Sequence, residues 1–136
     1  MQVSTTFLST LSSQAKTSPR LRQNYDLRNS EEDNSQRMLN ALEPGTVMPI
    51  HRHRKTSETI CMVRVKMVMR LYDDKGNVTD EFVMEPCGKH PMVQVEAGQW
   101  HSLEVLEEVY PKLGVYHELV EGRQRTGGMS RWRKRM

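Results

Sequence analysis

Cysteine, aromatic side chains and uninterrupted apolar sequence are all scarce in this chain of 136 residues. Its only two cysteines, Cys61 and Cys87, have no CxxC or CxxH neighbours, which excludes a disulfide scaffold and a cysteine-rich zinc site. We expect both to be small buried apolar residues in a reducing compartment. The richest apolar stretch is interrupted by Arg64, Lys66 and Arg70, so no segment approaches the roughly 20 apolar residues that span a bilayer.

The beginning of the chain also lacks the pattern of a secretory signal. Phe7, Leu8 and Leu11 stand among Ser and Thr residues, with no basic region before them and no long apolar region around them. The expected location is therefore the cytoplasm. The length suits one soluble domain, and the content of 36% hydrophobic and 27% charged residues argues against wholesale disorder.

Positive charge is concentrated at one end, although the formal net charge is only +3. Residues 121–136 contain six Lys or Arg against one Glu, which leaves the rest of the chain slightly acidic. This distribution is typical of a solvated, flexible basic tail and not of a nucleic-acid-binding domain. If the tail did bind nucleic acid or acidic lipid headgroups, that binding would fall steeply with salt. We expect no nucleic acid partner.

Helical periodicity is confined to the first residues. Leu8, Leu11 and Ala15 recur at helical spacing behind Ser and Thr caps, which predicts a short amphipathic helix that ends before Pro19. The sequence that follows, up to residue 35, is polar and has no sustained period. It is expected to form an arm over the domain, with one short strand around Asn24–Leu27.

From residue 36 onward, short apolar or alternating runs are separated by turn residues, which predicts eight to ten strands. The predicted strands occupy residues 36–42, two segments within 58–72, then 78–84, 92–95, 99–105 and 112–119. Asp73–Asn77 is expected to form a hairpin turn in which Gly76 takes a positive φ. Pro and Gly lie between the runs, so an all-β antiparallel sandwich or barrel is favoured over βαβ units. The expected divisions are a helix and arm at 1–35, a β-domain at 36–120 and a basic tail at 121–136.

One cluster of residues suggests chemistry. His51 and His53 are two apart on an extended segment, so their side chains project to the same face. Glu58 follows after a turn and begins the next predicted strand, which can return its carboxylate to the same point. His101, after Gly98, can supply a fourth ligand from a separate strand. A lone pair of histidines at this spacing is more typical of an exposed strand end, so the metal interpretation depends on all four residues together.

Three neutral imidazoles and one carboxylate suit a divalent transition metal better than Ca²⁺ or Mg²⁺. Zn²⁺, Fe²⁺, Mn²⁺, Ni²⁺ and Cu²⁺ all remain compatible with this ligand set. If the ion is octahedral, four protein ligands leave two positions for water or substrate, as in a working metal centre.

The spacing from Gly45 through His51 and His53 to Glu58 resembles the first metal motif of the cupin superfamily, and the run GQWH resembles the core of the second. More narrowly, the chain resembles the WbuC family of small cupin-fold metalloproteins from about Leu8 to Leu119. The blocks that carry this narrower resemblance are SPRLRQNYD, SQRMLNALEPGT, HRH and VEAGQWHSLEVL. The resemblance implies a cupin fold, a double-stranded antiparallel β-barrel or jelly roll, with the helix and arm added at its N-terminus.

Three positions depart from the usual cupin pattern. Val65 stands where a Gly is usual, Glu96 where a Pro is usual, and Val105 where an Asn is often found. None of these departures removes a ligand. The resemblance therefore supports His51, His53, Glu58 and His101 as ligands of one divalent metal, with Zn, Fe, Mn or Ni expected.

Other candidate residues have two interpretations each. Arg20, Arg22, Asn24 and Arg37 are expected to contact an anionic substrate, since basic side chains on an arm can close over a barrel mouth, but surface salt bridges are an equal alternative. His90 is expected in a loop. His117 is expected to be a core histidine, with a role beside the metal as the alternative. Trp100 should point away from His101 and pack in the core or in a dimer interface, and the ten methionines should fill the core.

The resemblance to the WbuC family implies a metal-dependent enzyme that acts on a sugar or nucleotide-sugar metabolite in surface-polysaccharide biosynthesis. Isomerisation or epimerisation is slightly favoured over oxygenation. The sequence shows no separate general base, which supports the alternative of a non-catalytic metal- or metabolite-binding module. The expected partners are a small polar or anionic metabolite and a second copy of the chain in a homodimer.

Overall fold

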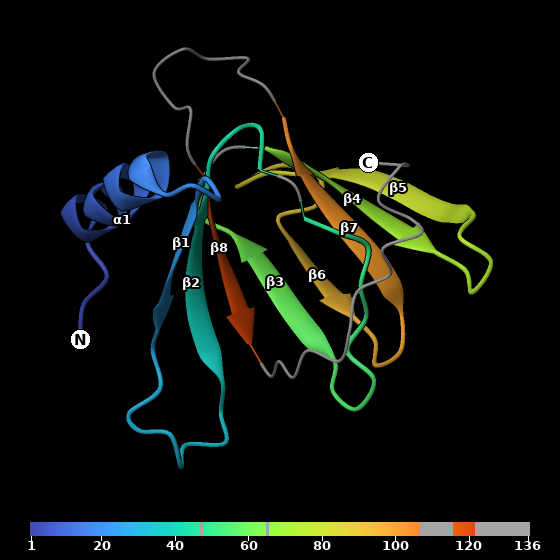
Figure 1. The fold of residues 1–136 in the computed structure, drawn as a ribbon, viewed down its shortest axis with the longest axis horizontal. Coiled ribbons are helices and arrows are strands. Elements are labelled where there is room, and N and C mark those ends of the chain that lie inside the picture. Colours follow the sequence, from blue (N-terminus) through green and yellow to red (C-terminus); the bar gives the residue numbers. More distant parts are fainter. Residues whose placement is uncertain (47, 65, 107–115, 122–136) are drawn as a thin grey trace.

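A computed structural model describes residues 1–46, 48–64, 66–106 and the backbone of 116–121. One helix is followed by eight strands in this part of the chain (Figure 1). The elements are α1 Thr5–Thr17, β1 Arg22–Asp26, β2 Arg37–Leu42, β3 Glu58–Met62, β4 Met67–Tyr72, β5 Val78–Met84, β6 Met92–Val95, β7 Trp100–Val105 and β8 Tyr116–Glu121.

The strands form two antiparallel sheets. One sheet has the order β1-β2-β8-β3-β6 and the other has the order β5-β4-β7. Side chains from both sheets meet in one apolar cluster, so the sheets pack face to face as in a jelly roll. Among the described residues the two sheets stay open, so the closed barrel expected from the resemblance is instead a sandwich of two separate sheets.

Methionine fills much of the core between the sheets, as predicted. Met62, Met67, Met69 and Met84 are all nearly inaccessible to solvent and belong to the main core cluster. Their flexible thioether side chains fill irregular gaps where the two sheets meet. Met92 is an exception, because it lies exposed at the start of the edge strand β6.

Helix α1 packs against β1 and β2 at one edge of the larger sheet (Figure 1). The Ser4 side chain caps it by accepting a hydrogen bond from the Phe7 N–H at 3.1 Å. Leu8, Leu11 and Ala15 are buried, which confirms the predicted apolar face. The helix ends at Thr17, before Pro19, as the sequence indicated.

The expected strands are found with small changes in their bounds. β2, β5, β6 and β7 coincide with the predicted segments or begin one residue later, and residues 58–72 contain the two predicted strands. The turn between β4 and β5 is also confirmed, with Gly76 at φ 90°. The last strand was predicted at 112–119, and the described strand is Tyr116–Glu121, with 112–115 outside the described residues.

Both cysteines differ from the expectation of burial. Cys61 is half-buried on β3, and Cys87 is exposed in the loop after β5, where its φ is 57°. The loop sequence Glu85–Gly88 turns sharply there, so the side chain at position 87 points to solvent.

No helix in the described part of the chain is long and apolar enough to cross a membrane. The predicted basic tail lies outside the described residues, apart from Glu121.

Candidate metal centre

A single pair of backbone hydrogen bonds sets two of the predicted ligands side by side. The His51 N–H donates to the His101 carbonyl at 3.0 Å, and the His101 N–H donates to the His51 carbonyl at 2.9 Å. This exchange forms an isolated antiparallel bridge at the start of β7. A third hydrogen bond, from the Gly98 N–H to the His53 carbonyl at 2.7 Å, holds the next histidine of the same segment.

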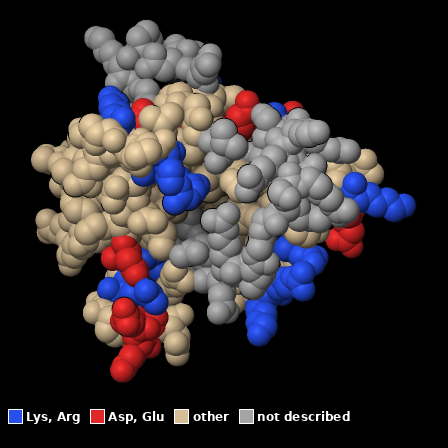
Figure 2. Space-filling view, viewed as in Figure 1, with Lys and Arg blue, Asp and Glu red and all other residues tan. Residues whose placement is uncertain are grey.

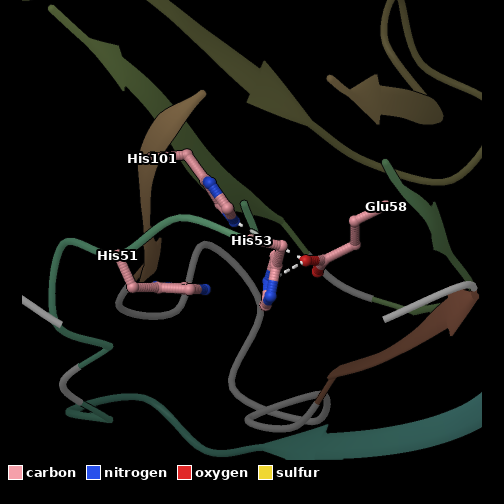
Figure 3. A group of neighbouring side chains, drawn as sticks. All are labelled: His51, His53, Glu58 and His101. Atoms are coloured by element: carbon pink, nitrogen blue, oxygen red, sulfur yellow. Dashed lines mark ion pairs between the residues drawn. The ribbon is translucent and has the colours of Figure 1, made fainter. Parts of the chain in front are cut away.

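Strand alternation directs all four predicted ligands inward. His51 and His53 are two apart and share a face, as predicted. Glu58 begins β3, where the inward positions continue with Ile60 and Met62, and His101 shares its inward face with the core residues of β7. The four side chains therefore converge at one end of the space between the sheets (Figure 3).

The carboxylate of Glu58 lies among the imidazoles. Its Oε2 contacts the Nε2 of His53 directly and is 3.7 Å from the Nε2 of His101. The ring centroids of His51 and His101 are 4.3 Å apart, and those of His51 and His53 are 5.1 Å apart. All four ligand atoms lie within 4.8 Å of one another.

Backbone carbonyls fix the tautomer of two rings. The Nδ1–H of His51 donates to the Pro49 carbonyl at 2.8 Å, and the Nδ1–H of His101 donates to the Gln99 carbonyl at 2.9 Å. The Nε2 of each ring is then left without a proton and faces the cluster. A carbonyl that holds the second ring nitrogen is the usual support of a metal-binding histidine.

Burial and neighbouring groups shift the pKa values of His51 and Glu58 toward the protonation states that metal binding requires. His51, His53 and Glu58 are each no more than 5% exposed, and His101 is fully buried. Burial, reinforced by the nearby His101, lowers the pKa of His51 to about 3, so this imidazole is neutral at physiological pH. Burial alone would raise the pKa of the Glu58 carboxyl, but His101 and His53 hold it well below its ordinary value, so it is ionised.

These donors fit one transition-metal ion. Ligand atoms bound at roughly 2.0–2.2 Å from one ion lie within about 4.4 Å of one another, so the observed span of 4.8 Å needs only a small inward shift. The Nε2 of His101 is buried and has no hydrogen-bond partner among the described residues, which is costly unless something else binds it. Three imidazoles and one carboxylate favour Zn, Fe, Mn or Ni over Ca or Mg.

A cavity of about 410 Å³ opens onto His51, His53 and Glu58. Three of the four predicted substrate contacts, Arg20, Arg22 and Asn24, line it. Sequence reasoning missed the remaining lining residues, which are Ser18, Gln23, Met38, Asn40, Leu42, Met48 and Leu103. The inward alternation of residues 38, 40 and 42 on the predicted strand was the available signal for three of them.

The wall of the cavity opposite the ligands comes from β1 and β2. Asn24 pairs with Asn40 in the register of these strands, and Arg22 pairs with Leu42. The guanidinium of Arg22 lies 2.9 Å from the Met48 sulfur, which is a weak hydrogen-bond acceptor. Leu21 separates the two arginines at φ 53°, and its carbonyl accepts hydrogen bonds from the Glu43 N–H and the Thr46 hydroxyl.

Three further candidates lie apart from the cavity lining. Arg37 is bound by Asp33 at 3.1 Å and by backbone carbonyls of the β1–β2 loop, as in the salt-bridge alternative. His90 lies in the loop before β6, as predicted, with its ring 5.0 Å from that of Phe82. His117 pairs with Ala41 in the register of β8 and β2, and its side chain lies outside the described part of the structure.

Side chains on the face of these segments that points away from the ligands also make defined contacts. Trp100 points away from the ligands, is 7% exposed and packs with Ile50 and Tyr72, so it has the predicted core role. Arg52, between the two histidines, lies with its guanidinium carbon 4.5 Å from the centroid of the Trp100 ring.

The facing antiparallel sheets have the jelly-roll arrangement of cupins, and the buried cluster of three histidines and one glutamate could hold a metal ion. A family model described as "Domain of unknown function (DUF6016)" matches residues 3–84, which is more than half of the chain. The chain therefore belongs to this family. Membership in the WbuC family stays a prediction. No curated protein matches the chain.

Solved structures with the same fold are distant in sequence. KdgF from Halomonas sp. is 13% identical with a TM-score of 0.56, over 79% of this chain and 85% of that protein. A cupin 2 domain-containing protein from Halorhodospira halophila is 15% identical with a TM-score of 0.56, over 79% of this chain and 68% of that protein. Oxalate oxidase in complex with the substrate analogue glycolate is 16% identical with a TM-score of 0.61, over 82% of this chain and 56% of that protein. At these sequence identities the structural similarity shows a shared fold.

Proposed function

We propose that this protein is a metal-dependent cupin enzyme that holds one Zn, Fe, Mn or Ni ion through His51, His53, Glu58 and His101. The observation that carries the proposal is the convergence of four buried ligand atoms within 4.8 Å, with three of the four residues lining a cavity. A bound ion would supply Lewis-acid chemistry to a substrate oxygen there. The protein's part is to orient the three imidazoles, to keep His51 neutral and to limit access of bulk water.

The cavity supports a small anionic, hydroxylated substrate. Arg20 and Arg22 offer cationic hydrogen-bond donors for a carboxylate or phosphate. The Asn24 and Asn40 side chains offer amide donors and acceptors suited to hydroxyl groups. A volume of about 410 Å³ is near the lower end for small-molecule sites, which suits a monosaccharide derivative. We extend this to a sugar or nucleotide-sugar metabolite of surface-polysaccharide biosynthesis, supported by the resemblance to the WbuC family.

A second candidate is a non-catalytic metabolite-binding module. The described cavity lining contains no carboxylate or imidazole besides His51, His53 and Glu58, all of which are metal ligands in this proposal. A reaction that needs a general base must then use a group bound to the metal or part of the substrate. If neither serves, the same site would bind its ligand without converting it.

The experiment is a calorimetric titration of metal-loaded protein with four probes: gluconate, glucose 6-phosphate, UDP-glucose and sorbitol. Saturable heat on addition of an anionic probe, with much weaker binding of sorbitol, is expected. Arg22→Gln should weaken binding about 10- to 100-fold, because a hydrogen bond to a charged group is lost. Arg28→Gln is the matched control, since Arg28 pairs with Asp26 in the exposed β1–β2 region. Metal-loaded protein that binds no probe would contradict the substrate proposal.

Turnover is tested with the probes that bind. Isomerisation or epimerisation moves a proton at carbon, so in D₂O the metal-loaded enzyme should introduce deuterium into a carbon position that NMR detects. Exchange that disappears in the His101→Ala variant supports the enzyme. Saturable binding with no exchange and no new product supports the non-catalytic module instead.

A further inference from the structure

The two segments that supply the histidines are joined by very little backbone pairing. His51 and His101 share one isolated bridge, and one further hydrogen bond links Gly98 to His53. In a regular sheet several consecutive pairs would fix the register. Here the relative position of three imidazoles depends on contacts outside the ladder.

A side-chain contact on the reverse of the site joins the same two segments. Arg52 stands between His51 and His53, and Trp100 immediately precedes His101. Because side chains alternate along extended backbone, both residues point away from the ligands and meet each other. The guanidinium carbon of Arg52 lies 4.5 Å from the centroid of the Trp100 ring, within the range of a cation–π contact.

Trp100 is held firmly enough to serve as an anchor. Its ring packs with Ile50 and Tyr72, and the Tyr72 hydroxyl is 2.8 Å from the Ser102 hydroxyl. The Gln99 amide donates to the carbonyls of Tyr72 and Trp100, each at 2.9 Å. On the other side, Arg52 lies 3.9 Å from the carboxylate of Asp74 in the β4–β5 turn.

We infer that Arg52 is a positioning residue. Its cation–π contact with Trp100 holds the His51–His53 segment against β7 and so sets the coordination geometry of the metal site. Arg52 is not among the residues that line the cavity. Its effect is transmitted through the backbone of the residues on either side of it. The inference rests on the proposed metal site.

The Arg52–Trp100 contact predicts a specific defect in metal binding when Arg52 is replaced. Without the cationic planar group, the His51–His53 segment can shift relative to His101, and one imidazole moves out of bonding distance. Supports of this kind typically contribute 10- to 100-fold to metal affinity. Since the Arg52 side chain is partly exposed, we expect the lower part of this range, about 10- to 30-fold.

The test uses Co²⁺ alone as the probe, because its visible absorption reports coordination geometry as well as binding. Arg52→Met keeps the bulk of the side chain and removes its charge, and Arg52→Lys keeps the charge. Arg54→Met is the matched control, since Arg54 is an exposed arginine two residues away. Melting temperatures of the metal-free variants separate a loss of folding from a loss of positioning.

Arg52→Met should bind Co²⁺ about 10- to 30-fold more weakly and show an altered absorption band at saturation. Arg52→Lys should recover most of the affinity and the spectrum, and Arg54→Met should match the unmodified protein. An Arg52→Met protein with the same affinity and spectrum, whatever its melting temperature, would overturn the inference. Absence of Co²⁺ binding by the unmodified protein would overturn the proposed metal site and this inference with it.

Discussion

At the scale of single residues, the site is defined by histidines whose free nitrogens face inward. The carbonyls of Pro49 and Gln99 take the Nδ1–H groups of His51 and His101, and burial lowers the pKa of His51 so that this ring is neutral. A metal-free cluster of this kind leaves buried nitrogen and carboxylate atoms poorly satisfied. Metal binding would resolve this cost, so we expect the ion to stabilise the folded state.

Replacing His101 with alanine should weaken metal affinity by more than about 100-fold, which exceeds the usual loss for a supporting residue. His101 is fully buried, and its Nε2 has no hydrogen-bond partner among the described residues. Metal content after dialysis against a weak chelator measures the effect. His90→Ala is the control, because His90 lies in a loop outside the cavity. Equal metal retention by both variants would contradict the ligand assignment.

The metal-free protein should lose stability in mild acid. The pKa of His51 is about 3 in the folded protein and 6.5 is its ordinary value. Between these values the unfolded chain binds a proton that the folded protein does not, so the free energy of unfolding falls as the pH drops from 6.5 toward 3. The lowered pKa of Glu58 acts in the same direction below pH 4.5.

Each pKa unit corresponds to about 1.4 kcal/mol, so His51 accounts for a loss of about 2–3 kcal/mol between pH 6.5 and 4.5. Urea unfolding of chelator-treated protein at several pH values measures this loss. His51→Gln should show a smaller decline over the same interval. An identical decline in both proteins would show that His51 is not the responsible group.

At the residue scale the sequence predicted that His51, His53, Glu58 and His101 lie together, because strand alternation and motif spacing are local properties. Their role as metal ligands stays a prediction. The sequence could not predict the Arg52–Trp100 contact, since that contact depends on how two distant segments are placed together. It placed Cys87 in the core wrongly, because a cysteine in a turn has no local signal for burial. The roles of Arg20, Arg22, Asn24 and Arg37 in substrate binding stay predictions.

At the scale of elements, α1 supports the strands that form the cavity wall. Its buried residues pack against Leu39 and Ala41 of β2, whose neighbours Asn40 and Leu42 face the cavity. The apolar face of the helix was evident in the sequence, and so were most strand bounds. The pairing of β8 between β2 and β3 was not, because it joins segments far apart in the chain.

Leu11→Ala should destabilise the protein by about 2–4 kcal/mol through loss of buried apolar contact and the cavity that remains. Leu11 is 3% exposed and lies at the centre of the α1 contact with the sheet. Ser13→Ala is the control, because Ser13 is exposed on the same helix. Urea unfolding gives both values, and a loss below about 1 kcal/mol for Leu11→Ala would contradict the docking of α1.

Gly98→Ala should cost about 1–2 kcal/mol, because the turn before β7 requires φ 84°. A Cβ at this position would meet no atom within 4 Å, so the cost is one of backbone conformation and not of crowding. Thermal or urea unfolding measures it. An unchanged stability would show that the turn relaxes without cost.

At the scale of the whole molecule, the described surface carries acidic and basic side chains in separate small groups on the face in view (Figure 2). The all-β antiparallel class was predictable from strand number and turn placement, and the jelly roll from the resemblance to cupins, but the open edges of the two sheets depend on long-range pairing. A homodimer stays a prediction, and light scattering should give about twice the chain mass of 15.9 kDa. A monomer mass at micromolar concentration would contradict it.

The central claim is a single metal centre, and elemental analysis of protein purified without added metal tests it most directly. One transition-metal ion per chain is predicted, and it should be absent when His51 and His53 are both replaced by alanine while the circular dichroism of the fold is retained. No metal in either protein, together with no stabilisation by added Zn²⁺, Fe²⁺, Mn²⁺ or Ni²⁺, would contradict the account.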